Sequence, residues 1–141
     1  MSRVINTEST GKHRNQQMRL TAEMLRRLSV KAGLDDEARD MTATLIFSLR
    51  KIDEGIEASA SVWDNRDYYM KAEELRQRWA WAGRMADELR AMVIQDRWED
   101  LPALLAKLFP KVSDITVVKF TSKESDWAGN YTRLMAEQRA R

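Results

Sequence analysis

The sequence predicts an all-α protein, a helical bundle built on a long antiparallel helix hairpin (residues 35–63 and 67–97) with an N-terminal helix and two shorter C-terminal helices. The main observation is an apolar stripe with alternating steps of four and three residues, which is typical of a long helix packed lengthwise against other helices. Its members are Tyr68, Ala72, Leu75, Trp79, Ala82, Ala86, Leu89 and Val93. The second observation is that five Gly and two Pro are few for the many turns of an all-β fold.

Chain length and composition predict one domain. The 141 residues match the commonest domain size, and we expect a single helical-bundle domain over residues 11–141 after a disordered N-terminus, residues 1–10. The chain has no cysteine, which excludes disulfides and thiolate chemistry. No stretch reaches the roughly 18 apolar residues of a membrane span, and the N-terminus lacks the apolar core of a signal peptide. We therefore expect a soluble, cytoplasmic protein with no membrane partner.

The first expected helix covers residues 12–32, where Gly33 can adopt the left-handed conformation that closes a helix. The second begins after Asp35, a good N-cap followed by two more acids that suit the positive end of the helix dipole. Asp64 and Asn65 predict a tight connection to the striped helix. The second and third helices therefore form an antiparallel hairpin.

The C-terminal third predicts two shorter helices. Asp100 can cap a helix that Pro110 should end at Phe109, because the residue before proline disfavours the helical conformation. Residues 115–120, the only β-branched run, predict an extended segment that crosses and covers the bundle, since a lone strand has no partner. Thr121 and Glu124 have the spacing of a capping box for the last helix. We expect both helices to close the second face of the striped helix.

Several catalytic classes lack their residues. His13 is the only histidine, and no Gly-x-Ser-x-Gly elbow accompanies it for serine-nucleophile catalysis. A bundle di-iron site needs Glu-x-x-His, which is missing, and no glycine-rich phosphate loop or dinucleotide fingerprint is present. We therefore predict no catalytic residue, no metal and no cofactor.

One alternative with a metal stays open. Magnesium prefers oxygen ligands, and an all-α nucleotide pyrophosphohydrolase holds it with acids that project from paired helices. In this chain Asp53 and Glu57 share one face of the second helix, and Glu73 lies near the start of the third. The hypothesis requires these three carboxylates to converge on one ion.

Charge is distributed unevenly along the chain, although the net charge is only +2. Residues 1–33 carry seven Lys and Arg against two acids, residues 34–75 five against eleven, and residues 76–141 twelve against nine. Either the acidic and basic helices neutralise each other, or a basic face remains for an anionic partner such as nucleic acid. The predicted anion-contact residues are Lys12, Arg14, Arg19, Arg26, Arg27 and Lys31.

A second candidate surface lies on the striped helix. Trp81 follows Trp79 by two residues, so it lies about 200° around the helix and cannot share the same seam. Either this side is packed within the chain, or Trp81, Met85 and Met92 form an exposed interface, since aromatic residues and Met are enriched in interfaces. We expect a non-catalytic helical protein that acts through contacts with itself or another protein, as an oligomer or a subunit of a complex; a small nucleic-acid-binding subunit is the alternative.

Overall fold

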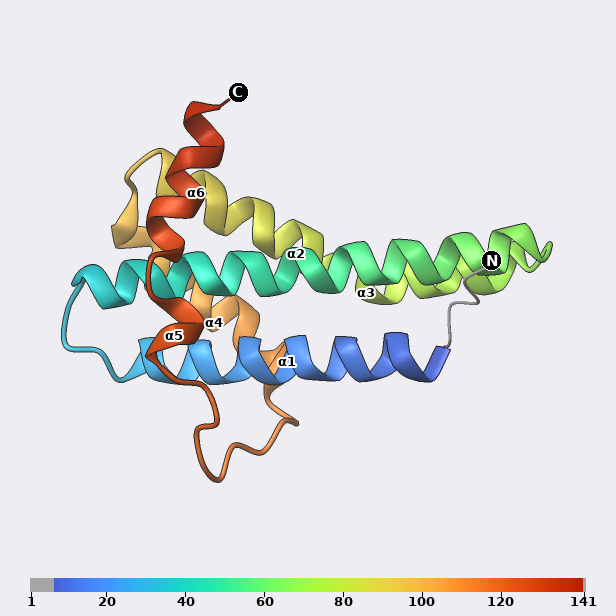
Figure 1. Ribbon diagram of the computed structural model, residues 1–141, viewed down its shortest axis with the longest axis horizontal. Coiled ribbons are helices and arrows are strands. Elements are labelled where there is room, and N and C mark those ends of the chain that lie inside the picture. The colour runs from blue at the N-terminus through green and yellow to red at the C-terminus, as the bar shows by residue number, and fades with distance from the viewer. Residues whose placement is uncertain (1–6, 141) are drawn as a thin grey trace.

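The fold is the predicted all-α bundle. The computed structural model describes residues 7–140, with side chains from residue 11 onward, and contains no strand within that range. Three long helices dominate it: α1 (Thr7–Ser29), α2 (Asp36–Asn65) and α3 (Tyr69–Ile94). α2 and α3 form the antiparallel hairpin, and α1 packs along α2 (Figure 1).

Two aspartates define the start of the hairpin and its turn. The Asp35 carboxylate accepts a 2.7 Å hydrogen bond from the Ala38 N–H, so the predicted N-cap of α2 is confirmed. The connection to α3 begins two residues later than expected, at residues 66–68, because α2 continues through Asn65. Asp67 takes a φ of 63° there, a left-handed conformation that aspartate tolerates better than most residues. This residue reverses the chain.

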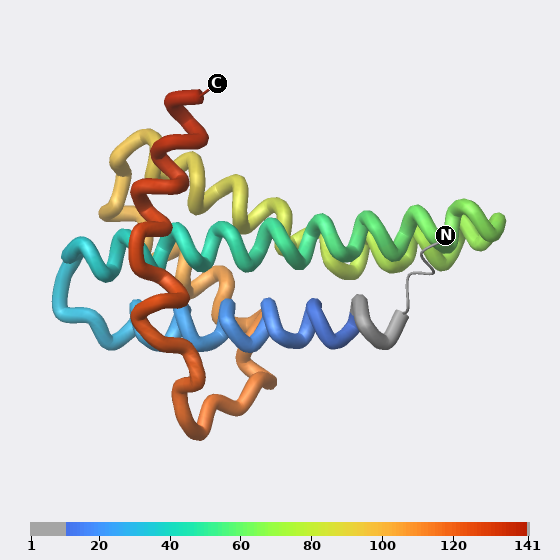
Figure 2. Tube along the Cα trace, viewed as in Figure 1, coloured from blue at the N-terminus to red at the C-terminus, as the bar shows by residue number. Residues whose placement is uncertain are grey.

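Four shorter elements complete the bundle. They are the 3-10 turn η1 (Trp98–Asp100), α4 (Leu101–Val112), α5 (Glu124–Trp127) and α6 (Asn130–Arg139). α4 packs between α1 and α3, whereas α5 and α6 pack on α2, with α6 crossing it steeply (Figure 2). The expectation that both C-terminal helices close the face of α3 is therefore correct for α4 and wrong for the last helix.

The first helix differs from its prediction at both ends. α1 begins at Thr7, so residues 7–10, which we expected to be disordered, are helical; residues 1–6 lie outside the described part of the chain. α1 ends at Ser29 rather than at residue 32, and Gly33 has no positive φ. The Lys31 N–H instead donates to the Leu28 carbonyl, which tightens the last turn before the chain leaves the helix.

Tertiary packing also overrides two expected helix boundaries in the C-terminal third. α4 continues through Pro110 as far as Val112, whose side chain is buried, so burial of the last turn outweighs the hydrogen bond that proline cannot donate. The last helix is divided at Gly129, which has a φ of 82°. The predicted capping box at Thr121 is wrong, because that residue bonds to Glu23 of α1 instead.

The core is not uniform along the hairpin. Most of the stripe on α3 is buried where α1, α2 and α4 surround it, but Leu75 and Trp79 are half-buried and Tyr68 is 54% exposed. The turn between α2 and α3 lies beyond the end of α1 and far from α6 (Figure 2). The molecule thus has a packed body at one end of its long axis and a two-helix extension at the other. None of the described helices is both long enough and apolar enough to span a membrane.

Candidate functional site: an apolar groove beside helix α4

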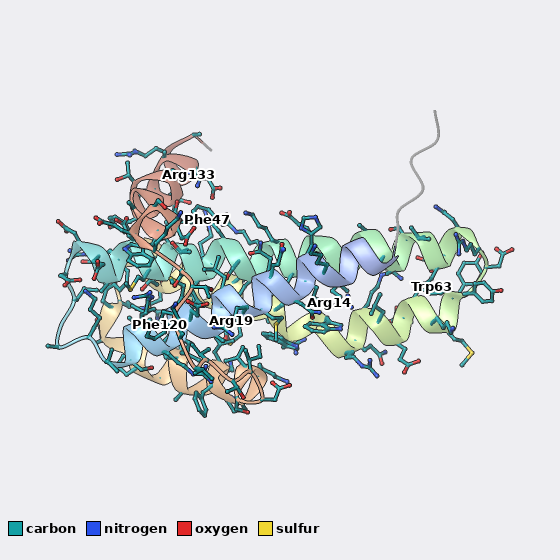
Figure 3. The ribbon with its side chains drawn as sticks, turned by 60° about the horizontal axis from the view of Figure 1, so that its bottom comes forward. Arg14, Arg19, Phe47, Trp63, Phe120 and Arg133 are labelled. Carbon is teal, nitrogen blue, oxygen red and sulfur yellow. The ribbon has the colours of Figure 1, made fainter. Side chains whose placement is uncertain are left out.

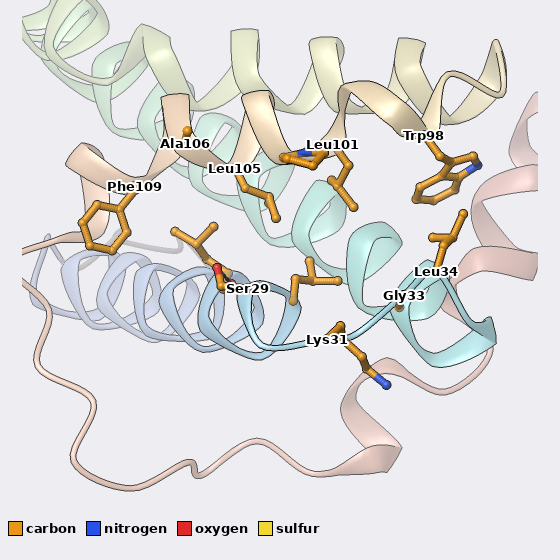
Figure 4. Close-up of a pocket in the computed structure, with 13 residues that line it drawn as sticks. Ser29, Lys31, Gly33, Leu34, Trp98, Leu101, Leu105, Ala106 and Phe109 are labelled. Atoms are coloured by element: carbon orange, nitrogen blue, oxygen red, sulfur yellow. Dashed lines mark hydrogen bonds between the residues drawn. The ribbon is translucent and has the colours of Figure 1, made fainter.

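A groove of about 540 Å³ opens between the end of α1, the loop that follows it, η1 and α4 (Figure 4). Its wall is mostly apolar. We call it the apolar groove, and it is lined by Leu25, Leu28, Ser29, Lys31, Gly33, Leu34, Ala38, Trp98, Leu101, Pro102, Leu105, Ala106 and Phe109. Its volume lies within the roughly 300–1,000 Å³ of typical ligand sites.

The sequence creates this groove through two features. α4 carries its leucines on one side, so Leu105 and Leu108 are buried against the bundle while Phe109, next to them, remains 50% exposed. α1 ends at Ser29, and the chain then continues as a loop that carries Leu34, which is 40% exposed. Because no helix covers the space between this loop and α4, apolar side chains line an open surface.

The groove contains little that is polar or reactive. Lys31 is its one charged residue, and its amine binds the carboxylates of Glu37 and Asp35. The hydrogen bonds to Glu37 and then Asp35 raise the pKa of Lys31, so the amine stays protonated and paired. The Ser29 hydroxyl donates to the Leu25 carbonyl within α1. With no histidine or carboxylate in its wall, the groove suits the binding of an apolar group rather than acid–base chemistry.

The predicted interface residues lie elsewhere and are buried. Trp81, Met85 and Met92 expose 9%, 4% and 1% of their surfaces, so the prediction that they form an exposed interface is wrong. The reason is that α4 packs against the second side of α3, where Lys111 places its amine 5.8 Å from the Trp81 ring centroid. The apolar face that remains open lies on the side of α4 that faces the end of α1, and it was not recognised from the sequence.

Three of the predicted anion-contact residues bind the protein's own backbone. Arg26 donates to the Ile115 carbonyl at 2.6 Å, and Arg19 donates to the carbonyls of Thr116 and Lys119. Arg27 binds the carbonyl and hydroxyl of Ser122. These arginines hold residues 115–122, which we call the crossing segment, along α1 (Figure 3). Residues 115–120 form no strand, as expected, but the segment bends at residues 115, 118 and 119, and it is the partner of the basic helix.

Glu23 completes this attachment. Its side chain is 1% exposed, and its carboxylate accepts hydrogen bonds from Arg19 and from the N–H and hydroxyl groups of both Thr121 and Ser122. Burial alone would raise the pKa of Glu23, but these donors, led by the Ser122 N–H, lower it to about 2. Sequence reasoning missed this residue, although a single acid among the six cations of residues 12–32 was a signal of a paired, buried carboxylate.

The remaining predicted cations do not gather into one surface. Lys31 pairs with acids at the start of α2, Arg14 lies 5.1 Å from the Trp79 ring centroid, and Lys12 is exposed. Among the described side chains, ion pairs between the basic first segment and the acidic second one therefore form in the loop between α1 and α2, where Lys31 binds Asp35 and Glu37. The rest of the basic helix interacts with backbone carbonyls and aromatic rings, as Arg27 does above Phe120 and Trp127.

The carboxylates of the pyrophosphohydrolase alternative are engaged differently. Arg76 binds Glu57 through two hydrogen bonds and lies 4.0 Å from Glu73. Asp53 rests against Gly83, where partial burial and the neighbouring charges of Asp87 and Glu57 raise its pKa. Among the side chains of residues 11–140, no group of three His, Asp or Glu residues is arranged to hold a metal ion.

Comparison with protein-family models, with curated proteins and with solved structures found no match to this chain.

Proposed function

We propose that this chain is a non-catalytic helical binding protein that acts through protein–protein contacts, as an oligomer or as a subunit of a larger assembly, and that the apolar groove is its docking site. The observation that carries the proposal is the groove itself: Leu34, Trp98 and Phe109 leave apolar surface open in a concave wall whose one charge is already paired. A helix that lays an apolar face into such a groove is a recurrent mode of protein recognition.

The two alternatives have less support. Nucleic-acid binding would need Arg19, Arg26 and Arg27 on a surface, and these side chains bind the crossing segment. Charge reversal at these positions would also detach that segment, so it is not a clean test of nucleic-acid binding. The pyrophosphohydrolase would need Asp53, Glu57 and Glu73 to converge on one metal ion. The Arg76 guanidinium instead pairs with Glu57 and Glu73. We place the protein in the cytoplasm, because a core without cysteine needs no oxidising compartment.

Two alanines of α4 provide a matched test of docking. Ala106 lines the groove, whereas Ala103 is exposed on the same helix outside it. Random peptides long enough for two to four helical turns are selected by display on the wild-type protein, and their affinities are then measured on the Ala106→Glu and Ala103→Glu variants. We expect selected peptides to carry apolar residues at helical spacing. We also expect Ala106→Glu to weaken them by about tenfold or more, since it buries a charge in an apolar contact.

The control and the contradicting result are equally specific. Ala103→Glu adds the same charge to the same helix and should leave the peptide affinities unchanged. Failure to enrich any peptide, or equal binding to wild type and Ala106→Glu, would show that the groove is not a docking site. Circular dichroism of both variants checks that α4 stays helical.

A further inference from the structure

A second pocket lies between the first half of α1 and the second half of α2. Its volume of about 370 Å³ is within the range of sites that hold small molecules. We call it the interhelical pocket, and its wall includes His13, Arg14 and Gln17 of α1 and Lys51, Glu54 and Gly55 of α2. The apolar groove lies at the other end of α1, and the two sites share no residue.

The interhelical pocket carries an excess of positive charge. Among the side chains that the structure describes, neither Arg14 nor Lys51 forms an ion pair, and neither does Glu54, the one acid of the wall. Two permanent cations therefore outnumber one carboxylate, and the imidazole of His13 adds a further hydrogen-bonding group. Guanidinium, ammonium and imidazole groups are those with which proteins bind phosphate.

Two side chains of α1 have hydrogen-bonding groups to offer in the pocket. The Arg14 guanidinium lies over the Trp79 ring, 5.1 Å from its centroid, and stacking of this kind leaves the N–H groups at the edge of the guanidinium available. Gln17 Oε1 is buried and accepts no hydrogen bond from a described residue. The Gln17 amide can rotate to present its NH₂ donors to an anion instead, so Gln17 is an unused polar group in this wall.

Gly55 provides space on the α2 side of the pocket. A glycine inside a helix is destabilising relative to alanine, so its presence requires a reason. Gly83 of α3 has one, because a Cβ there would lie 2.9 Å from the Asp53 carboxyl carbon. A Cβ at Gly55 would meet no neighbouring element within 4 Å, so packing inside the chain does not require this glycine. A bare stretch of helix beside unpaired cations is suited to close approach of a ligand.

We propose that the interhelical pocket binds a small organic phosphate. The phosphate lies between His13, Arg14 and Lys51, where both cations and the imidazole can reach it. The apolar part of the ligand rests against α2 at Gly55 and Ala58, because most of the surface inside the pocket is apolar. This site is separate from the proposed docking groove, so neither role depends on the other.

The single histidine of the chain makes the site directly observable. The ring protons of His13 give one set of signals in NMR, which are followed during titration with phenyl phosphate, inorganic phosphate or phenol at constant pH and ionic strength. We expect a saturable shift with phenyl phosphate, weaker binding of inorganic phosphate and no shift with phenol. Absence of a saturable shift with phenyl phosphate would overturn the proposal, and equal affinity for inorganic phosphate would overturn the apolar half of the site.

Filling the pocket from α2 tests where the ligand lies. Gly55→Leu places a side chain in the open space and improves helix propensity, so we expect it to weaken phenyl phosphate at least about tenfold without loss of helicity by circular dichroism. Ser61→Leu, at an exposed position of α2 outside the pocket, should bind like the wild type. Unchanged affinity in folded Gly55→Leu would place the phosphate elsewhere and refute the site.

Two charge variants give a further test that does not depend on the folding of Gly55→Leu. Lys51→Gln removes a cation that faces the phosphate and should weaken binding about threefold or more, whereas Glu54→Gln removes the opposing acid and should strengthen it. Lys119→Gln, which removes an exposed cation of the crossing segment, is the control for net charge and should change little. Equal effects of Lys51→Gln and Lys119→Gln would mean that phosphate responds only to the total charge of the protein, against the proposal.

Discussion

The body of the bundle and the far half of the hairpin use the same helices in different surroundings. In the body, α2 is enclosed by α1, α3, α5 and α6, and Leu45 and Leu49 are completely buried. Toward the tip, α2 and α3 have mainly each other, and Leu75 is only half-buried although it belongs to the same apolar stripe. The comparison shows that the large side chains of the stripe are fully buried only where a third layer covers the seam, whereas near the turn only small residues such as Ala60 and Ala72 are.

Polar interactions follow the same division. In the body, Glu23 is buried and accepts five hydrogen bonds from α1 and the crossing segment. In the hairpin, Arg76 binds the exposed Glu57 and the half-buried Asp64 across α2 and α3, and these acids raise the pKa of Arg76. Both arrangements join separate elements, but water competes more strongly for the second, whose acids are far more exposed than Glu23.

The largest expected effect contrasts two leucines. Leu49→Ala in the body should reduce the free energy of unfolding by about 2–5 kcal/mol, because it leaves a cavity in a closed core. Leu75→Ala in the hairpin should cost roughly 1 kcal/mol, since water already reaches that side chain. Urea unfolding of the two variants measures the difference. Equal losses would mean that the hairpin is packed as tightly as the body.

The next effect concerns the attachment of the crossing segment. Glu23→Gln removes the charge that Arg19, Thr121 and Ser122 bind, and we expect a loss of about 3 kcal/mol, the equivalent of the pKa change from 4.5 to about 2. In the same variant, the rate of amide hydrogen exchange in residues 115–122 should increase. Glu54→Gln, an exposed position on α2, is the matched control and should change little.

The same carboxylate predicts a pH dependence. Its pKa is lower in the folded protein than in the unfolded chain, so the unfolded state binds the proton more readily. The stabilisation is therefore complete above about pH 4.5 and is lost as the pH falls toward about 2. Acid titration of unfolding free energy should show this slope in the wild type and a flatter curve in Glu23→Gln. Identical curves would mean that the carboxylate contributes no charge-dependent stability.

The smallest effect belongs to the hairpin. Arg76→Gln removes the exposed ion pairs to Glu57 and Asp64 and should lower the melting temperature less than Glu23→Gln does. Molar salt screens exposed pairs, so the difference between wild type and Arg76→Gln should shrink in high salt, while that for Glu23→Gln should persist. The opposite salt response would reverse the assignment of buried and exposed charge.

Local sequence was sufficient for elements whose signals are local. The stripe on α3 and the Asp35 cap predicted the structure they form, because side-chain spacing and backbone capping depend on near neighbours. The ends of α1 and α4 were misplaced for the opposite reason: burial of Val112 keeps α4 helical past Pro110, and no local rule contains that burial.

The candidate site was the least predictable part. The sequence indicated that Trp81, Met85 and Met92 form a second apolar side of α3, but only the packing of α4 decided that they are buried and that Phe109 and Leu34 are open instead. Likewise it showed a basic first helix, and only the fold revealed that its arginines bind the carbonyls of the crossing segment.

By itself, then, the sequence determined the helical class, the hairpin and the absence of familiar catalytic motifs, since these follow from periodicity and residue type. The tertiary structure decided which apolar and charged faces remain at the surface. Helices α2, α3 and α4 each pack against more than one neighbour, and which part of their apolar surface stays exposed depends on elements that lie far apart in the chain.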